Sequence, residues 1–459
     1  MHLLRTRTYE LVNVEESFRE TPPYAILSHR WQGKEIVFKD LSSAPLSSFE
    51  RREGSEESFT KIRGACALAQ NEDPKLEYIW IDTCCIDKSS SEELRTALNS
   101  MFKWYHEAEV CYTFLFDVTY SGWNKRMFDS NLEHRKEKEN PRDQASEWFE
   151  RGWTLQELFA PVSMEFYDKH WKPMGTRDQL AELVGEKAGI DSRYLKDDGS
   201  QKYLFREASV AVKMSWMVGR MTRDVEDIAY SLLGIFNVNL IQQYGEGHKA
   251  FSRLQETIMA DTGSFDESLF AWELPKNGEL RCYLKVKPQP EGRPGKPVEL
   301  IPKFEPVKDN RWGLLAPSPD CFKQSEELGD VVILQDKVRP RLGAGFQRTH
   351  QGIFVTLPYP EVRNHAFGYL KKKVRFPLNC WRLEKGRVKT IVLELERDSN
   401  DSLLRTKCDK LEGDPSAKVG NTRSKMAFGV DQGSMFTVPV TIAQPQIDLI
   451  YPAAQRALR

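Results

Sequence analysis

One short segment, Arg151-Gly152-Trp153-Thr154-Leu155-Gln156-Glu157-Leu158, combines an acid and an indole at a spacing that suits ligand chemistry. Its pattern predicts a helix, on which residues four apart share a face, so Glu157 lies beside Trp153. The opposite face is a packing stripe made of Trp148, Gly152, Leu155 and Phe159. A carboxylate held against an indole can bind a flat cationic ring, because the ring stacks while its charge is balanced. The same pattern also fits a helix buried on both sides, with Glu157 paired to a basic residue.

The composition argues against several classes of protein. A length of 459 residues predicts about three domains. The 66 basic and 67 acidic side chains give a formal net charge of −1, so no basic excess indicates a nucleic-acid partner. No apolar run has the length of a signal peptide or a membrane span, and we expect a cytoplasmic protein. The eight cysteines form no C-x-x-C pair and have no histidine at ligand spacing, which predicts reduced thiols rather than disulfides or a metal site.

The chain changes character twice along its length. Strand-like and helix-like segments alternate over residues 1–175, which is typical of a mainly parallel sheet with helices on its faces. Helical patterns without strand signals predict a helical module over 176–265. Short alternating runs, such as Asp330 to Leu334, Gly352 to Leu357 and Val388 to Leu395, predict a β-rich C-terminal domain over 266–459. Within the first region, the charged and poorly periodic stretch 118–145 predicts a surface insertion. Whether this insertion gates a site is left open by the sequence.

Four short apolar runs predict buried strands, and they are Tyr24 to Leu27, Tyr78 to Ile81, Val110 to Leu115 and Met164 to Tyr167. Polar side chains follow the first two. The first runs into Ser28-His29-Arg30-Trp31 and the second into the stretch from Asp82 to Lys88. Open α/β sheets bind their ligands at the carboxyl ends of the strands, so we expect these groups to converge there.

Structural roles remain open for several of these groups. His29 also fits a hydrogen-bonded spacer, and Arg30 also fits the partner of a structural acid such as Asp82. Asp82 and Asp87 also fit residues that stabilise the following loop and helix start. The adjacent Cys84 and Cys85 raise a further alternative, a thiol nucleophile beside His29.

Three strings carry a family resemblance: YAILSHRW, YIWIDTCCIDKSS and RGWTLQELFAP, in this order and spacing. Together they resemble the heterokaryon-incompatibility (HET) domain of filamentous fungi over about residues 20–175. That domain in turn resembles, more distantly, the TIR domain. The resemblance implies a flavodoxin/TIR-like, mainly parallel α/β sheet domain. It also places the glutamate that cleaves NAD⁺ in enzymatic TIR domains on Glu157. The sequence departs from the TIR pattern in the long insertion and in His29, where TIR often has Tyr or Phe.

The activity implied by this resemblance is hydrolysis of NAD⁺ to nicotinamide and ADP-ribose. Nicotinamide leaves as a neutral base, so a single carboxylate suffices and no cofactor is required. The expected substrate is NAD⁺ or NADP⁺. The expected substrate-binding residues are Ser28, His29, Arg30, Trp31, Asp82, Lys88 and Trp153, with Glu157 catalytic and no metal ligands.

In biological terms, the resemblance implies a cell-death or innate-immunity effector that is switched on by self-association or by an activating protein. Two alternatives stand beside the enzyme. One is a non-enzymatic, TIR-like assembly module whose motifs serve packing. The other is a hydrolase that depends on Cys84 or Cys85.

Overall fold

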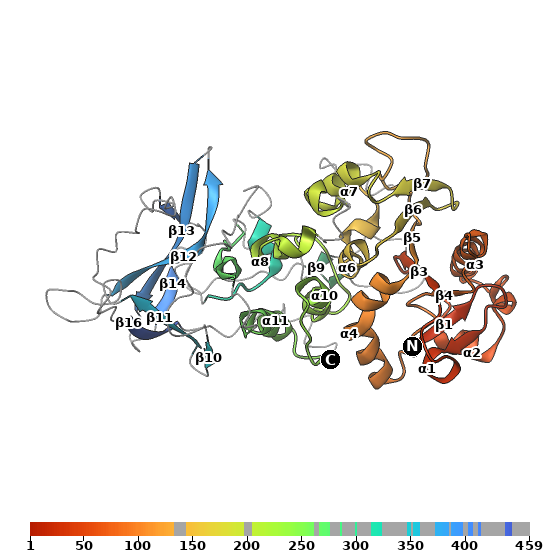
Figure 1. Cartoon of the computed structure of the whole chain (residues 1–459), viewed down its shortest axis with the longest axis horizontal. Helices are drawn as coiled ribbons and strands as arrows, with labels where there is room; N and C mark the ends of the chain where they lie inside the picture. Colours follow the sequence, from red (N-terminus) through yellow and green to blue (C-terminus); the bar gives the residue numbers. More distant parts are fainter. Residues whose placement is uncertain are drawn as a thin grey trace. The chain divides into compact units, whose positions relative to one another are not determined.

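The computed structural model describes only part of the chain, namely residues 1–132, 144–196, 204–260, 266–275, 285–286, 299–300, 314–323, 347–349, 352–358, 372–384, 387–397, 403–406, 412–414 and 437–442. The chain forms two compact units, one of residues 1–207 with 230–242 and one of 208–229 with 243–459 (Figure 1). The helical stretch predicted over 176–265 contributes to both units. The division into three domains at 175 and 265 stays a prediction.

A seven-stranded sheet forms the centre of the first unit, with the strand order β2-β1-β4-β3-β5-β6-β7. Four neighbouring strands pair in parallel, which confirms the predicted mainly parallel sheet. The strands β1, β2 and β7 add antiparallel edges that the sequence did not predict. The bounds are β1 His2–Arg5, β2 Leu11–Asn13, β3 Tyr24–His29, β4 Tyr78–Trp80, β5 Val110–Leu115, β6 Met164–Asp168 and β7 Pro173–Thr176.

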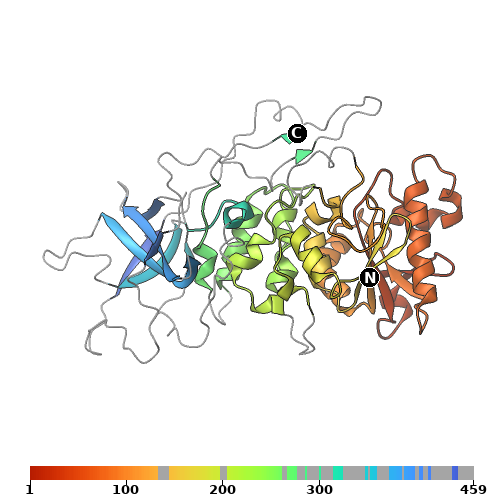
Figure 2. The ribbon, with the colours of Figure 1, turned by 90° about the horizontal axis from the view of Figure 1, so that it is seen from above.

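The two parallel strands that follow β3 in the chain are placed on opposite sides of it in the sheet. From β3 the chain crosses to β4 on one side through α3 (Glu56–Asn71), and then returns past β3 to β5 through α4 (Ser91–Glu107). Right-handed crossovers in opposite directions put these helices on opposite faces of the sheet, and Figures 1 and 2 show helices on both sides. The carboxyl ends of β3 and β5 therefore flank a topological switch point, where such sheets bind ligands.

Local sequence explains where α4 begins. The hydroxyl of Ser90 accepts a hydrogen bond from the backbone N–H of Glu93 at 3.3 Å, and Glu92 and Glu93 place negative charge in the first turn. Both features stabilise a helix N-terminus, which the triplet Ser89-Ser90-Ser91 before two glutamates predicts at this point. The remaining helical segments of the first unit are α1 Val14–Ser17, α2 Phe38–Ser43, η1 Leu46–Phe49, η2 Glu147–Glu150, α6 Thr154–Phe159, α7 Ala181–Ala188, η3 Ser192–Tyr194, η4 Leu204–Glu207 and α10 Leu233–Phe236.

The helix predicted through Trp148 and Glu157 is interrupted. Residues 147–150 form the 3₁₀ helix η2, Arg151 adopts an extended backbone conformation (φ −82°, ψ 133°), and α6 begins only at Thr154. All six residues of α6 are buried. The prediction of one continuous helix with two opposite stripes is therefore wrong. Trp148 and Glu157 lie in different helical segments, so helical spacing does not determine which faces they share.

The second unit is built from short helices and a separate sheet. Seven strands form that sheet, in the order β10-β11-β16-β14-β13-β12 with β15 paired to β13. The patterns at 352–357 and 388–395 are strands as predicted, whereas the pattern at 330–334 lies outside the described residues. The bounds are α8 Val210–Ser215, α9 Asp227–Tyr230, α11 Lys249–Ala260, η5 Glu267–Phe270, β8 Lys285–Val286, β9 Glu299–Leu300, η7 Pro319–Phe322, β10 Gln347–Thr349, β11 Gly352–Pro358, β12 Lys373–Glu384, β13 Arg387–Arg397, β14 Leu403–Thr406, β15 Glu412–Asp414 and β16 Thr437–Ile442.

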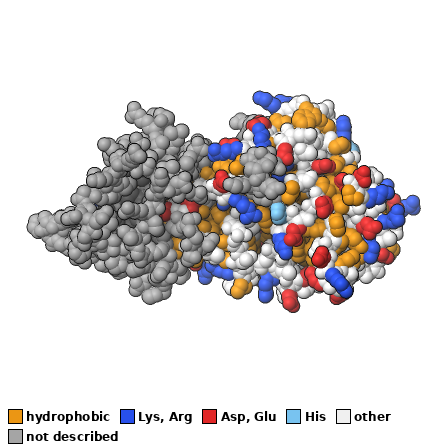
Figure 3. Space-filling model, viewed as in Figure 1, with side chains coloured by type: hydrophobic (Ala, Val, Ile, Leu, Met, Phe, Trp, Pro, Cys, Tyr) orange, Lys and Arg blue, Asp and Glu red, His pale blue; other side chains and the backbone are white. Residues whose placement is uncertain are grey.

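The described surface carries charges of both signs. On the face drawn in Figure 3, the Lys and Arg side chains alternate with Asp and Glu side chains rather than gathering by sign. Within the described ranges, no helix combines the length and the hydropathy needed to cross a bilayer.

Candidate functional site

The carboxylate of Glu157 lies in a buried hydrogen-bond chain that joins three elements. Ser28, near the end of β3, donates its hydroxyl hydrogen to Glu157 Oε2 at 2.5 Å. The same hydroxyl oxygen accepts a hydrogen bond from the indole N–H of Trp148 in η2 at 2.9 Å. Glu157 is only 5% exposed, and Ser28 and Trp148 are fully buried. The predicted site residues Ser28 and Glu157 are thus brought together across 129 positions of sequence.

Burial has a large effect on the protonation of Glu157. The pKa of this carboxyl is raised to about 8, chiefly because burial desolvates it, and the negative charge of Asp82 contributes to the rise. The hydrogen bond from Ser28 and the positive charge of Arg151 act in the opposite direction and lower the pKa. At neutral pH the acid is therefore mostly protonated. A cation placed beside it would lower its pKa and favour the carboxylate form.

His29 is buried beside Asp82 without a hydrogen bond between the two side chains. His29 Nε2 lies 3.6 Å from Asp82 Oδ1, and the His29 side chain is 1% exposed. Desolvation lowers the pKa of His29 well below its ordinary value, and the nearby ammonium of Lys61 lowers it further. The ring is therefore neutral at pH 7. Neither ring nitrogen has a hydrogen-bond partner among the described residues, so the structure does not show the predicted hydrogen-bonded spacer, and a role as a base stays a prediction.

Trp31 and Asp82 form a second pair at the same edge of the sheet. The indole N–H of Trp31 donates to Asp82 Oδ2 at 2.7 Å. Over the ring of Trp31 lies the ammonium of Lys88, with Nζ 3.4 Å from the ring centroid, and the guanidinium carbon of Arg151 is 5.9 Å from it. Trp31, Asp82 and Lys88 therefore form one cluster, as the convergence of the strand ends predicted. Arg151 joins this cluster although the sequence did not single it out.

The ion pair of Arg30 is formed with an acid other than Asp82. The Arg30 guanidinium forms an ion pair with the carboxylate of Glu147 in η2. The backbone N–H of Glu147 in turn donates to Asp117, which follows β5, at 2.9 Å. Asp82 is thus not the acid that pairs with Arg30. The ion pair fixes η2, and with it Trp148, against the ends of β3 and β5.

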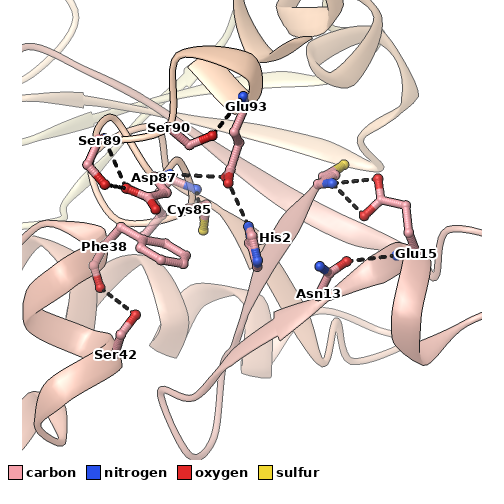
Figure 4. A network of polar contacts seen from close by, with 12 residues as sticks. His2, Asn13, Glu15, Phe38, Ser42, Cys85, Asp87, Ser89, Ser90 and Glu93 are labelled. Carbon is pink, nitrogen blue, oxygen red and sulfur yellow. Dashed lines mark hydrogen bonds and ion pairs between the residues drawn. The ribbon is translucent and has the colours of Figure 1, made fainter. Parts of the chain in front are cut away.

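A polar network fixes the loop that carries Lys88 (Figure 4). The backbone N–H of Asp87 donates to Glu93 Oε1 at 3.0 Å, and the His2 ring lies 3.0 Å from the same oxygen. Asp87 Oδ1 accepts hydrogen bonds from both the backbone N–H and the hydroxyl of Ser89, at 2.9 and 2.6 Å. Asp87 therefore stabilises the loop and the start of α4, which was one of its two predicted roles.

The two adjacent cysteines belong to the core. Cys84 is fully buried and Cys85 is 1% exposed. Cys85 Sγ accepts a hydrogen bond from the backbone N–H of Ile81 at 3.4 Å. A hydrogen bond with Cys85, together with burial, raises the pKa of Cys84 well above its ordinary value. Since the thiolate is the nucleophilic form, this environment disfavours a thiol mechanism. The cysteines that the structure describes carry free thiols.

The structure adds to the neighbourhood of the carboxylate an indole that the sequence did not place there. Trp153 is the N-cap residue of α6 and is 7% exposed, and its carbonyl accepts a hydrogen bond from the backbone N–H of Glu157 at 3.4 Å. The indole that is hydrogen-bonded to Ser28 is Trp148, which the helical pattern had placed on the packing stripe. The neighbourhood of Glu157 also includes Tyr105 of α4. No local spacing indicates either residue, because both come from separate elements.

Metal ligation finds no support in the described part of the chain. Among those residues, no group of three or more His, Cys, Asp or Glu side chains is arranged to hold a metal ion.

Comparison with known proteins identifies this part of the chain. Residues 24–157 match the sequence model of the family described as "Heterokaryon incompatibility protein (HET)". The match begins at the first residue of β3 and ends on Glu157. Residues 24–157 form a HET domain. The HET domain therefore contains the hydrogen-bond chain of Glu157 and the Trp31 cluster.

Two further comparisons extend beyond the HET domain. Residues 249–366 match a domain of unknown function, DUF8212. The chain is also 41% identical over 245 residues to "Vegetative incompatibility protein HET-E-1" of Podospora anserina. The aligned part is 53% of this chain and 16% of the length of that relative. No solved structure matches the chain.

Proposed function

We propose that the HET domain cleaves NAD⁺ to nicotinamide and ADP-ribose, with Glu157 as the catalytic residue. One observation carries this proposal. A buried carboxylate, held by Ser28, lies at the switch point of a mainly parallel sheet and beside the Trp31–Asp82–Lys88 cluster. Ligands of open α/β sheets bind at such a point.

The chemistry follows from the leaving group. The nicotinamide of NAD⁺ is a cationic pyridinium, so it departs as a neutral base without a general acid. The transition state resembles an oxocarbenium ion, and a carboxylate in a water-poor site stabilises its positive charge. The approach of the cationic substrate also lowers the pKa of Glu157 and so favours the carboxylate form that the reaction needs.

The remaining groups suit the other parts of the substrate. The Trp31 ring offers a stacking surface, and the positive charges of Lys88 and Arg151 lie near it, where they suit the negative charge of a pyrophosphate. The same chemistry accommodates NAD⁺ and NADP⁺.

A likeness to TIR domains supports this reading. The four parallel strands occur in the spatial order second, first, third, fourth, which is the order of the first strands in a flavodoxin-like sheet. In the cell we propose a role in heterokaryon incompatibility, as the name of the similar Podospora protein indicates for that protein. The effector would act in the cytoplasm and be switched on by self-association or by an activating protein.

One assay tests the enzymatic proposal. The full-length protein, Glu157→Gln, Glu157→Ala and the control Glu186→Gln, which changes an exposed acid of α7, are incubated with NAD⁺ over a series of protein concentrations. We expect nicotinamide release from the wild type and the control, and at least a hundred-fold less from both Glu157 variants. Near-ultraviolet circular dichroism checks that the variants are folded. Equal release from all four proteins, or none from the wild type at any concentration, refutes the proposal.

The burial of Glu157 favours a second candidate function, that of a non-enzymatic assembly module. At 5% exposure the carboxyl also fits a packing role, in which its hydrogen bond to Ser28 fixes α6 against β3. This candidate predicts no nicotinamide release together with self-association that Glu157→Gln leaves unchanged. The hydrolase based on Cys84 or Cys85 is disfavoured by the burial of both thiols.

A further inference from the structure

The ammonium of Lys88 is in an unusual environment for a lysine. Its Nζ is buried and, among the described residues, has no hydrogen-bond partner. An ammonium carries three donors, and lysine side chains normally extend so that this group reaches water. Here it lies 3.4 Å from the centroid of the Trp31 ring, well within the range of a cation–π interaction. The aromatic face of Trp31 and the negative charge of Asp82 together compensate for the lost hydration of this charge.

The surroundings of that ring suit a larger cation better than an ammonium. Asp82 Oδ2 accepts the indole N–H of Trp31 at 2.7 Å, which fixes the plane of the ring. The other oxygen, Asp82 Oδ1, is buried and has no hydrogen-bond partner among the described residues. A planar cation that carries an N–H donor could stack on Trp31 and also supply this missing hydrogen bond.

We propose that Trp31 and Asp82 form a cation-binding site, here called the cation seat, which the ammonium of Lys88 occupies in the absence of a ligand. A cationic aromatic ring displaces this ammonium when it binds. The proposal deepens the NAD⁺ cleavage suggested above and rests on it for the identity of the ring, a pyridinium with a carboxamide. Without a ligand, the Lys88 ammonium therefore covers the face of the Trp31 ring on which a ligand would stack. The substrate must displace the ammonium before its ring can stack.

Displacement requires the Lys88 side chain to move. The backbone around Lys88 is fixed by the hydrogen bonds of Asp87, Ser89 and Glu93 (Figure 4). The four-carbon stem of a lysine has many rotamers, and the neighbouring Ser89 is exposed to solvent. An ammonium that leaves the ring regains its hydration. It can then meet negative charge elsewhere on the ligand.

Binding of 1-methylnicotinamide to the full-length protein tests the seat without any cleavage, because this cation has no glycosidic bond. We expect Lys88→Met to bind it about three- to ten-fold more tightly than the wild type, since the competing cation is gone. Lys103→Met is the matched control, because it removes an ammonium that is 70% exposed and lies 3.7 Å from Glu107. Its affinity should stay within two-fold of the wild type.

Binding of neutral nicotinamide distinguishes displacement of the Lys88 side chain from simple repulsion between Lys88 and a cationic ligand. If Lys88 covers the seat, Lys88→Met also binds nicotinamide more tightly, and adding Trp31→Leu removes the gain. A gain for the cation alone, or no binding of 1-methylnicotinamide to either protein, overturns the proposal.

A second measurement needs no variant at all. Acetylation of Lys88 in the wild type, followed by mass spectrometry, should rise when 1-methylnicotinamide is added, because the ammonium moves into solvent. A fall would mean that the ligand covers Lys88 in place, which overturns the proposal. These outcomes do not depend on whether NAD⁺ is cleaved, so the seat and the glycohydrolase can fail separately.

Discussion

Replacing Glu157 with glutamine should make the protein more stable, and increasingly so as the pH rises. The pKa of Glu157 is raised from 4.5 to about 8 in the folded protein, chiefly by burial. As the pH increases, the unfolded chain therefore releases this proton before the folded protein does. The free energy of unfolding falls with pH over that interval. Glutamine keeps an oxygen that can accept the hydrogen bond of Ser28, but it never ionises.

The size of the effect follows from the two pKa values. Each pKa unit is worth about 1.4 kcal/mol. The gap between 4.5 and about 8 corresponds to a destabilisation on the order of 5 kcal/mol above pH 8, and of about 3 kcal/mol at pH 7. Near pH 5 the two proteins should differ by less than about 1 kcal/mol. A gain in stability at the expense of activity is common when a buried active-site charge is removed.

Urea unfolding at pH 5, 7 and 8.5, followed by tryptophan fluorescence, measures this difference. Hydrogen exchange of the peptide that contains β3 assigns the transition to the first unit, since a chain of two compact units need not unfold in one step. Glu186→Gln, which changes an exposed acid, should show no such trend with pH. The reasoning is refuted if the difference between Glu157→Gln and the wild type is independent of pH, or if the wild type is the more stable protein at pH 8.5.

Two further substitutions test the surroundings of the site. Ser28→Ala removes a hydrogen bond that lowers the pKa of Glu157, so nicotinamide release at pH 7 should fall about ten-fold and partly recover at higher pH. An unchanged pH profile would contradict this role of Ser28. Gly64→Ala gains about 1 kcal/mol of helix propensity in α3, but its Cβ would lie 2.1 Å from Trp171 Nε1. We expect net destabilisation of about 2 kcal/mol in urea unfolding, and a stabilised variant would show that the indole moves away without strain.

Much of the first unit was predictable because its signals are local. The apolar runs at 24–27, 78–81, 110–115 and 164–167 each coincide with a strand, although β4 ends one residue earlier at Trp80, and a run of buried residues needs no distant partner to be recognised. Ser90 is the N-cap of α4 for an equally local reason, because its hydroxyl binds a backbone N–H three residues ahead. The antiparallel strands β1, β2 and β7 were missed, since each is only three or four residues long.

The sequence by itself determined the parallel sheet, its order of elements and the motifs that identify the HET domain, all of which depend on residues close together in the chain. Only the tertiary structure decided the partners within the site. It joined Ser28 to Glu157 across 129 positions and to Trp148 across 120, and it placed the ammonium of Lys88 on the ring of Trp31. It also broke the expected helix at Arg151. Such contacts form where separate elements meet in three dimensions, and helical spacing carries no information about them.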